Sequence, residues 1–270
     1  MQLLSILRTE WLKMKKYPAF WAMLAIVALS YPGMNYFFYS AGYKDQLNDK
    51  KMGVILAMLP NPFTFPDAWQ TVAYISSLFI FLPALLVIMF ISNEYTYKTH
   101  RQNIIDGWSR KDFMLGKLID VLLVSTLVTI LYAITAYVIG SINSGTVANA
   151  FEGIRYIGLF FLQVFAQLSL ALLVALVVRK AFIALGVFMF YYFPLEPAII
   201  GIAKEKWKLK LEFMPLEISD RLIPFPRWFT RDEAHWREIV AQSSAHIGYT
   251  FIFLVIVWWL CFFIIKKRDL

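Results

Sequence analysis

The chain has 270 residues, of which 60% are hydrophobic and 16% are charged. A typical soluble domain is about 45–50% apolar and about 25% charged, so this composition argues for an integral membrane protein with one membrane domain over residues 1–270. The net charge of +8 would also suit nucleic-acid binding. Excess Lys and Arg in cytoplasmic loops explains it better, so we expect the lipid membrane and no nucleic acid as a partner.

Residues 1–17 predict an amphipathic helix that lies in the membrane interface. Apolar side chains recur at helical spacing along one face, namely Leu3, Leu4, Leu7, Trp11 and Met14. Polar side chains fall on the opposite face, namely Ser5, Thr9, Lys13 and Lys16. A helix with a basic face and an indole on its apolar face suits the boundary between lipid and water.

Six apolar segments are long enough to cross a bilayer, for which a helix needs about 20 residues. They are residues 18–38, 70–92, 116–140, 156–178, 181–203 and 247–265. Only Arg179 and Lys180 separate the fourth segment from the fifth, which predicts a tight helical hairpin. The predicted fold class is an all-α integral membrane protein with an N-terminal interfacial helix and six transmembrane helices.

The distribution of Lys and Arg predicts that both ends of the chain are cytoplasmic. With six spans, the leader, the 93–115 loop, the 179–180 turn and the tail share one side, and they carry most of the basic residues of the short loops. Residues 204–246 then lie outside the cytoplasm. We expect them to form short helices that are partly re-entrant or that cap the outer face, and an exposed connecting loop is the alternative.

The sequence lacks the common motifs of enzymes and metal sites. It contains no phosphate-binding loop, no HExxH, no CxxC and no GxSxG. His100, His235 and His246 are far apart and lack metal-ligand spacing. We therefore expect no catalytic residue, no metal site and no cofactor bound by this chain.

Two carboxylates inside the predicted spans are candidates for a translocation path, because charged groups are costly in lipid. Asp120 lies about one turn into the third span, close enough to its end to reach the headgroups. Glu196 lies between Pro194 and Pro197, which break a regular helix. Either Glu196 borders the path, or the fifth span ends near Phe193 and Glu196 lies in the outer interface.

The 93–115 segment predicts a short helix and a corner between the second and third spans. Residues 99–106 have helical composition, and Gly107 is placed to end that helix. Ser109 and Asp112 have the spacing of a capping box, which begins a helix that continues into the third span. The alternative is an ordinary basic loop.

This stretch resembles the permease subunits of ABC-2 type transporters. The matching residues are Glu94-Tyr95-Thr96-Tyr97, Lys98-Thr99, Arg101, Gly107, Ser109-Arg110 and Gly116-Lys117. Lys98 departs from the pattern, since many members have glycine there. The layout of an interfacial leader, six spans and a large outer segment before the last span agrees, and it implies a fold like that of type-2 ABC exporters.

The resemblance implies the membrane-spanning permease subunit of an ATP-driven exporter in the cell membrane. Two permease copies, identical or homologous, would pair, and separate ATPase subunits holding ATP and Mg would dock beneath them. The short helix after the second span would be the coupling helix, with Glu94 as a hinge. The implied ATPase-coupling residues are Glu94, Arg101, Ile104, Ile105, Asp106, Trp108 and Arg110.

Two other functions stay open on the sequence alone. The chain could be an energy-independent membrane scaffold or channel, or an intramembrane enzyme that uses outer-face residues such as Asp232, Glu233 and His235. Aromatic spans without a central row of charges favour an amphipathic or hydrophobic substrate such as a lipid, a drug or a peptide.

Overall fold

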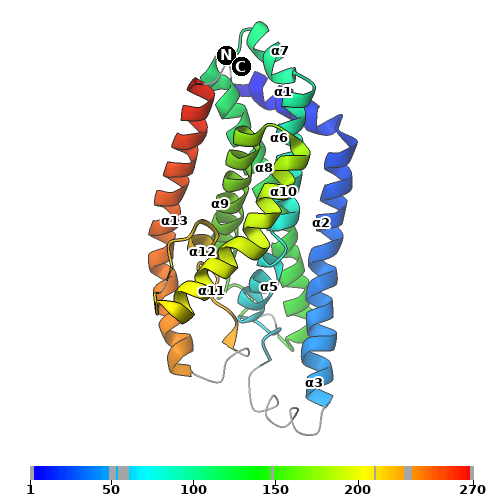
Figure 1. The fold of residues 1–270 in the computed structure, drawn as a ribbon. Coiled ribbons are helices and arrows are strands. Elements are labelled where there is room, and N and C mark those ends of the chain that lie inside the picture. The colour runs from blue at the N-terminus through cyan, green and yellow to red at the C-terminus, as the bar shows by residue number, and fades with distance from the viewer. Residues whose placement is uncertain are drawn as a thin grey trace.

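The computed structural model describes residues 3–48, 53, 61–146, 149–209, 211–227 and 233–267, with the side chains of 3 and 233–235 excepted. Within these ranges the regular structure is helical (Figure 1). The α-helices are α1 (Leu3–Lys15), α2 (Pro18–Phe37), α3 (Asp45–Asn48), α5 (Ala68–Ser77), α6 (Phe81–Thr96), α7 (Thr99–Ile105), α8 (Arg110–Asn143), α9 (Arg155–Val178), α10 (Ala181–Phe190), α11 (Glu196–Lys206), α12 (Pro215–Asp220) and α13 (Glu233–Lys267). Two π-helical turns, η1 (Phe38–Lys44) and η2 (Tyr191–Leu195), continue α2 and α10.

Four described helices are long and apolar enough to cross a membrane, and two bent pairs raise the number to as many as six. The four are Arg110–Asn143, Arg155–Val178, Ala181–Lys206 and Trp236–Lys267. The bent pairs are Leu4–Lys15 with Pro18–Asn48, at 80°, and Ala68–Ser77 with Phe81–Thr96, at 47°. The predicted fold class, an all-α membrane protein, is confirmed.

Helix α9 is the centre of the bundle and packs against α5, α6, α8, α10, α12 and α13. Its sequence is apolar and free of proline, and Ala166, Ala171 and Ala175 are fully buried. Small side chains allow close approach of neighbouring helices where lipid supplies no hydrophobic driving force. The helix ends at Arg179, whose φ of 58° is left-handed, and α10 begins at Ala181, which gives the predicted tight hairpin.

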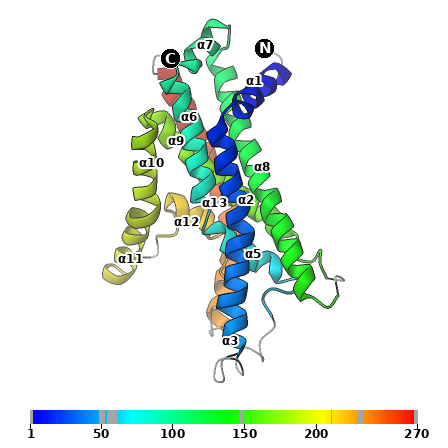
Figure 2. The same cartoon turned by 90° about the vertical axis from the view of Figure 1, so that its right-hand side faces the viewer.

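Both described chain ends lie at one end of the bundle, together with α1 and α7 (Figures 1 and 2). We call this the terminal end, and the opposite one, which carries α3, the distal end. Helix α8 begins at Arg110, as the Ser109–Asp112 capping box predicts, so it starts before the apolar segment at residue 116. Helix α13 begins at Glu233 rather than near residue 247. Hydropathy marks only the lipid-compatible part of a helix, while its backbone hydrogen bonds continue through polar residues. The predicted outer segment 204–246 is shortened accordingly.

The predicted second span is broken. Helix α5 ends at Ser77 and α6 begins at Phe81, with the 47° bend between them. Pro83 has no N–H to donate to the carbonyl of Phe79, so a regular helix cannot continue through this point. The span is therefore two helices that meet at an angle.

The predicted fifth span continues where its prolines were expected to break it. The chain passes Pro194 in the wider π-helical turn η2 and then forms α11 as far as Lys206, so the span does not end near Phe193. Glu196, at the start of α11, is 1% exposed. Its Oε1 accepts hydrogen bonds from the backbone N–H groups of Leu216 (2.9 Å) and Glu217 (2.8 Å), and so holds the first turn of α12.

Replacement of this carboxylate is expected to loosen α12. Glu196→Ala leaves two backbone N–H groups without their acceptor at a buried site, which costs about 1–3 kcal/mol. Hydrogen exchange measured by mass spectrometry should show faster exchange across Pro215–Asp220. Glu205→Ala is the matched control, because Glu205 is exposed on the same helix. Equal exchange in both variants would show that Glu196 does not anchor α12.

Candidate functional site

Helix α1 packs on the terminal end through a face that includes a charge. Ile6, Glu10 and Met14 are buried at four-residue spacing, while Leu4 is 73% exposed and Trp11 44% exposed. Leu4 and Trp11 of the predicted apolar face therefore do not pack on the bundle, whereas Met14 of that face does. The reason is that Glu10 reaches an ion pair inside the protein, which leaves Leu4 and Trp11 facing outward, where a membrane interface would cover them.

Five charged side chains from three helices form a buried group, which we call the ion cluster: Glu10, Lys13, Glu94, Lys117 and Asp120. The ammonium of Lys117 lies 2.8 Å from Glu94 Oε1, 2.8 Å from Asp120 Oδ2 and 3.3 Å from Glu10 Oε2. Lys13 adds contacts of 2.8 Å to Glu10 and 3.0 Å to Glu94. Lys117 is fully buried, and each of the three carboxylate side chains is at most 5% exposed.

Aromatic rings and a glycine complete the surroundings of the ion cluster. The Lys117 ammonium is 5.5 Å from the ring of Phe90 and 5.3 Å from that of Phe113, distances at which a cation interacts favourably with an aromatic face. At Gly116, an added Cβ would lie 2.9 Å from Glu10 Oε1. Glycine therefore allows α1 to approach α8 closely enough for Glu10 to reach Lys117.

The three carboxylates have a spacing that a metal ion could bridge, since Glu10, Glu94 and Asp120 each offer an oxygen within 4.8 Å of the others. The ammonium of Lys117 already lies among these oxygens, so the chain supplies its own cation there. Three carboxylates share two ammonium groups, which leaves a formal excess of negative charge. The cluster thereby links α1, α6 and α8 through charges that depend on one another.

Helix α7 is attached directly to the ion cluster. Nδ1 of His100 lies 3.0 Å from the backbone carbonyl oxygen of Glu94, and the hydroxyl of Thr99 donates to the same oxygen at 3.4 Å. The ring of His100 also packs on Tyr95 at 4.6 Å, and the guanidinium of Arg179 lies 4.9 Å from the Tyr95 ring. A displacement of α7 therefore also shifts the backbone of Glu94 and, through Tyr95, the surroundings of Arg179 in the turn between α9 and α10.

The predicted corner after α7 is present. Gly107 has a φ of 93°, a left-handed conformation that suits glycine and ends the helix. Ser109 and Asp112 form the capping box: the Asp112 carboxylate accepts from the Ser109 N–H at 2.9 Å, and the Ser109 hydroxyl accepts from the Asp112 N–H at 3.2 Å. Helix α8 then continues without interruption into the bundle.

The residues predicted to face an ATPase separate into two groups. Arg101, Ile105 and Asp106 are exposed, and Ile105 is 77% exposed despite being apolar. Ile104 is partly buried against the core. Trp108 is only 5% exposed, so its assignment as a surface contact is wrong: the indole packs inward, 5.4 Å from the Lys13 ammonium.

The other predicted site residues make contacts within the chain. Arg110 donates to the backbone carbonyls of Ile265, at 3.1 Å, and Lys266, and so fastens the last turn of α13 to the start of α8. Asp120 is 2% exposed and does not extend to the headgroups, because Lys117 lies one turn earlier on the same helix face. Glu196 holds α12, as described above. Asp232 and the side chains of Glu233 and His235 lie outside the described residues.

Sequence reasoning missed Glu10, Lys13 and Lys117 as members of a site. Lys117 had been used only in the count of basic residues that mark the cytoplasmic side and in the Gly116-Lys117 match to the ABC-2 pattern. One signal was available, because Glu10 lies four residues from both Ile6 and Met14 and so shares an apolar face with them. One partner of that charge, Lys13, lies only three residues away. The other partner, Lys117, lies 107 positions away, where no local pattern indicates it.

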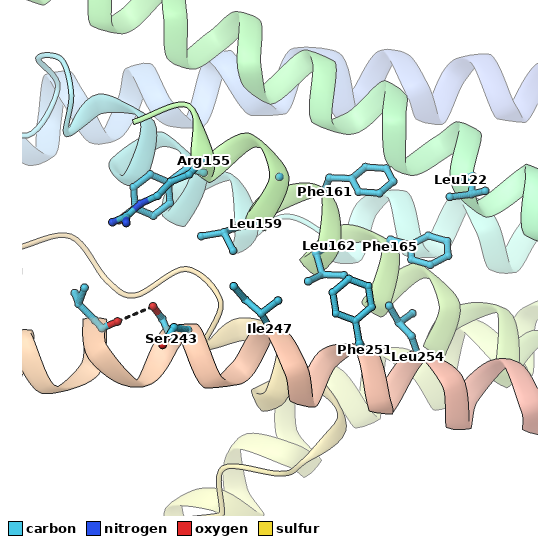
Figure 3. A pocket seen from close by; sticks show the side chains of 14 residues that line it. Leu122, Arg155, Leu159, Phe161, Leu162, Phe165, Ser243, Ile247, Phe251 and Leu254 are labelled. Atoms are coloured by element: carbon cyan, nitrogen blue, oxygen red, sulfur yellow. Dashed lines mark hydrogen bonds between the residues drawn. The ribbon is translucent and has the colours of Figure 1, made fainter. Parts of the chain in front are cut away.

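An apolar groove runs along the side of the bundle between α9 and α13, with a volume of about 600 Å³. Figure 3 shows Leu159, Leu162 and Phe165 of α9 opposite Ile247 and Phe251 of α13. The groove is open to the side of the bundle, and its lining is almost wholly apolar. It suits an acyl chain or an apolar helix.

Comparison with known proteins places these features in a family. A sequence model described as "ABC-2 family transporter protein" matches residues 6–195, which is more than half of the chain and includes the entire ion cluster and α7. No curated protein matches the chain significantly. The chain belongs to the ABC-2 family of transporter proteins. It is a multi-pass membrane protein and the permease component of a transport system, and this component is not itself catalytic.

Removal of the central cation is expected to destabilise the terminal end. Lys117→Met leaves Glu10, Glu94 and Asp120 with only Lys13 as a counter-charge, and breaking a buried ion pair costs about 3–5 kcal/mol. Thermal unfolding in lipid nanodiscs should show a clear fall in midpoint. Lys111→Met is the matched control, since Lys111 is exposed on the same helix. A midpoint equal to that of the control would contradict the central place of Lys117.

Proposed function

We propose that this chain is the membrane-spanning permease subunit of an ATP-driven exporter, located in the plasma membrane. A separate ATPase subunit binds at the terminal end and holds the ATP and Mg²⁺. A second permease chain, identical or homologous, completes the translocation path. The observation that carries the proposal is that α7, which has exposed residues, contacts the backbone carbonyl of Glu94, and Glu94 belongs to the buried ion cluster that joins three helices.

The path of force through this end is short. An ATPase that pushes on Arg101, Ile105 or Asp106 moves α7, and α7 is bonded to the backbone of Glu94. The side chain of Glu94 binds both Lys117 of α8 and Lys13 of α1. Because buried ions separate only at high cost, α1, α6 and α8 respond as one body. A permease without a nucleotide-binding motif depends on movement of a separate ATPase, so it needs a rigid region that receives this movement.

The charge distribution supports a cytoplasmic terminal end. Exposed basic side chains gather on α1, around α7, at the start of α8 and at the end of α13: Arg8, Lys15, Lys16, Lys98, Arg101, Arg110, Lys111, Lys266 and Lys267. Basic residues beside spans mark the cytoplasmic face of a membrane protein. An ATPase that uses cytoplasmic ATP docks on that face.

The surface of α10 supports a second permease chain or lipid at the side of the bundle. Ala181–Lys206 leaves most of its surface exposed, whereas α9 is largely enclosed. Phe182 is 90% exposed and Phe190 is 60% exposed. An apolar face of this kind is stable only against lipid or another apolar surface.

The docking assignment is tested by charge reversal on α7. The double variant Arg101→Glu with Asp106→Arg inverts two exposed charges while disturbing one surface hydrogen bond, from Gln102 to Asp106. We expect at least tenfold less ATPase recovered with the permease from native membranes in mild detergent. Glu152→Lys, at an exposed position between α8 and α9, is the control and should recover the ATPase normally. Equal recovery from both variants would remove α7 from the docking surface.

Transmission is tested separately from docking. Glu94→Gln keeps the shape of the side chain but removes the charge that binds Lys13 and Lys117. ATPase recovery should stay normal, because Glu94 is buried, while the ATP hydrolysis of the recovered complex should lose its stimulation by the permease. Glu152→Gln should change neither quantity. If Glu94→Gln abolished recovery and left the hydrolysis of any remaining complex unchanged, Glu94 would belong to assembly and not to transmission.

A further inference from the structure

A second polar group lies in the bundle, apart from the ion cluster, where α12 meets α9. Figure 1 shows α12 within the length of the bundle beside α9 and α13, and contacts join it to both helices. Oδ1 of Asp220 accepts hydrogen bonds from Nε2 of Gln163 at 2.9 Å and from Nε2 of Gln167 at 2.6 Å. Gln167 also donates to the hydroxyl of Ser219 at 3.2 Å.

The two glutamines are buried with their carbonyl oxygens unused. Gln163 and Gln167 are each 1% exposed, and within the described chain neither Oε1 has a hydrogen-bond partner. A buried acceptor without a donor costs free energy, so such a group in a native protein calls for a further partner. Two acceptors of this kind at one carboxylate form a site that lacks hydrogen-bond donors.

The charge at this site is also uncompensated. Among the salt bridges between described residues none involves Asp220, whereas its neighbour Glu217 is paired with Arg221 at 2.7 Å. Asp220 is exposed as a residue, although the hydrogen bonds that its Oδ1 accepts from Gln163 and Gln167 are part-buried, so a ligand can reach the edge of the site. In the part of the chain that the structure describes, two amide carbonyl oxygens that receive no hydrogen bond lie next to an accessible carboxylate that has no salt bridge. Such a site attracts a group that is positively charged and carries several N–H donors.

Aromatic side chains stand close to this carboxylate. Its charge acts on the hydroxyls of Tyr74 in α5 and Tyr192 in η2. The ring of Tyr192 packs with those of Phe81 and Phe193 at 6.0 and 5.1 Å. An apolar cavity of about 520 Å³ also borders Tyr191 and Pro215, the first residue of α12. The cavity is not lined by Asp220 or the two glutamines; it adjoins their site through Pro215, at the other end of α12 from Asp220.

We propose that Asp220, Gln163 and Gln167 form a binding site for the ammonium or guanidinium group of an amphipathic organic cation. Asp220 neutralises the positive charge, the two glutamine carbonyls accept its N–H groups, and the aromatic residues of α6 and η2 receive the apolar body. The proposal rests on the proposed transport function, and it narrows the substrate class to cationic amphipaths.

The protonation of Asp220 makes binding depend on pH. Neighbouring atoms that shield the Asp220 carboxyl group from water raise its pKa to about 7, and the hydrogen bonds from Gln163 and Gln167 offset only part of that rise. Below this pKa the carboxyl group is neutral and no longer attracts a cation, so affinity falls as the pH falls through about 7. The other titratable or charged side chains described around α12 include Tyr74, Tyr192, Glu196, Glu212, Glu217, Arg221 and His246.

The test uses the complex recovered from native membranes, placed in lipid nanodiscs without ATP, and phenethylammonium as the probe. Equilibrium binding at pH 8 should be saturable, while 2-phenylethanol, the neutral analogue, should bind at least tenfold more weakly. Asp220→Asn should weaken phenethylammonium binding at least tenfold and abolish its dependence on pH. Loss of the pH dependence in this variant would assign it to Asp220 rather than to His246. Glu205→Gln, an equal loss of charge at an exposed position of α11, should bind like the unmodified protein.

Three results would overturn the proposal. The first is equal binding of the amine and the alcohol. The second is equal amine binding at pH 5.5 and pH 8 in the unmodified protein. The third is displacement of the amine by equimolar Na⁺, which would indicate a site for an inorganic cation. The comparison of the two pH values needs no variant, so the proposal stays falsifiable if Asp220→Asn does not fold. Binding is measured without hydrolysis, so its failure is distinguishable from a failure of ATPase coupling.

Discussion

The constraint on which the terminal end depends is the burial of the Lys117 ammonium. An ammonium placed one to two turns inside a span is stable only when anions surround it, and α8 itself supplies just one of them, Asp120. The other two come from α6 and α1. The charge on α8 therefore determines where α1 crosses the end of the bundle and how α6 ends, and it makes a helix at the membrane surface part of the core.

The terminal end and the α12 region use polar groups in different ways. In the ion cluster, two ammonium groups lie among carboxylates from three helices and join those helices, although Glu94 Oε2 and Asp120 Oδ1 have no hydrogen-bond partner among the described residues. Beside α12, Asp220 and two glutamines supply acceptors without matching donors among the described residues, and the result is a site that a ligand can complete. A transporter needs both: a stiff region where force enters, and a region whose interactions are satisfied only while substrate is present.

Local features of this fold follow from the sequence because they depend on nearby residues. The hydropathy of the apolar runs predicts the membrane helices, and the Ser109–Asp112 capping box with Gly107 predicts the corner after α7. Arg179 and Lys180 predict the tight hairpin. Each depends on backbone hydrogen bonding over a few residues or on transfer of a helix into lipid, so a short window of sequence contains the information.

The ion cluster and the Asp220 site could not be predicted in this way, because their energies come from pairs far apart in the chain. Gln163 and Gln167 at four-residue spacing inside an apolar run do indicate a polar stripe on α9, but they do not name Asp220 as its partner. Likewise, Glu10 looks unfavourable on the inner face of α1 until Lys13 and Lys117 are placed beside it. The residues that appear most costly for a membrane helix are therefore the ones that specify how the helices assemble, since each restricts its neighbours to the few arrangements that supply a counter-charge or a donor.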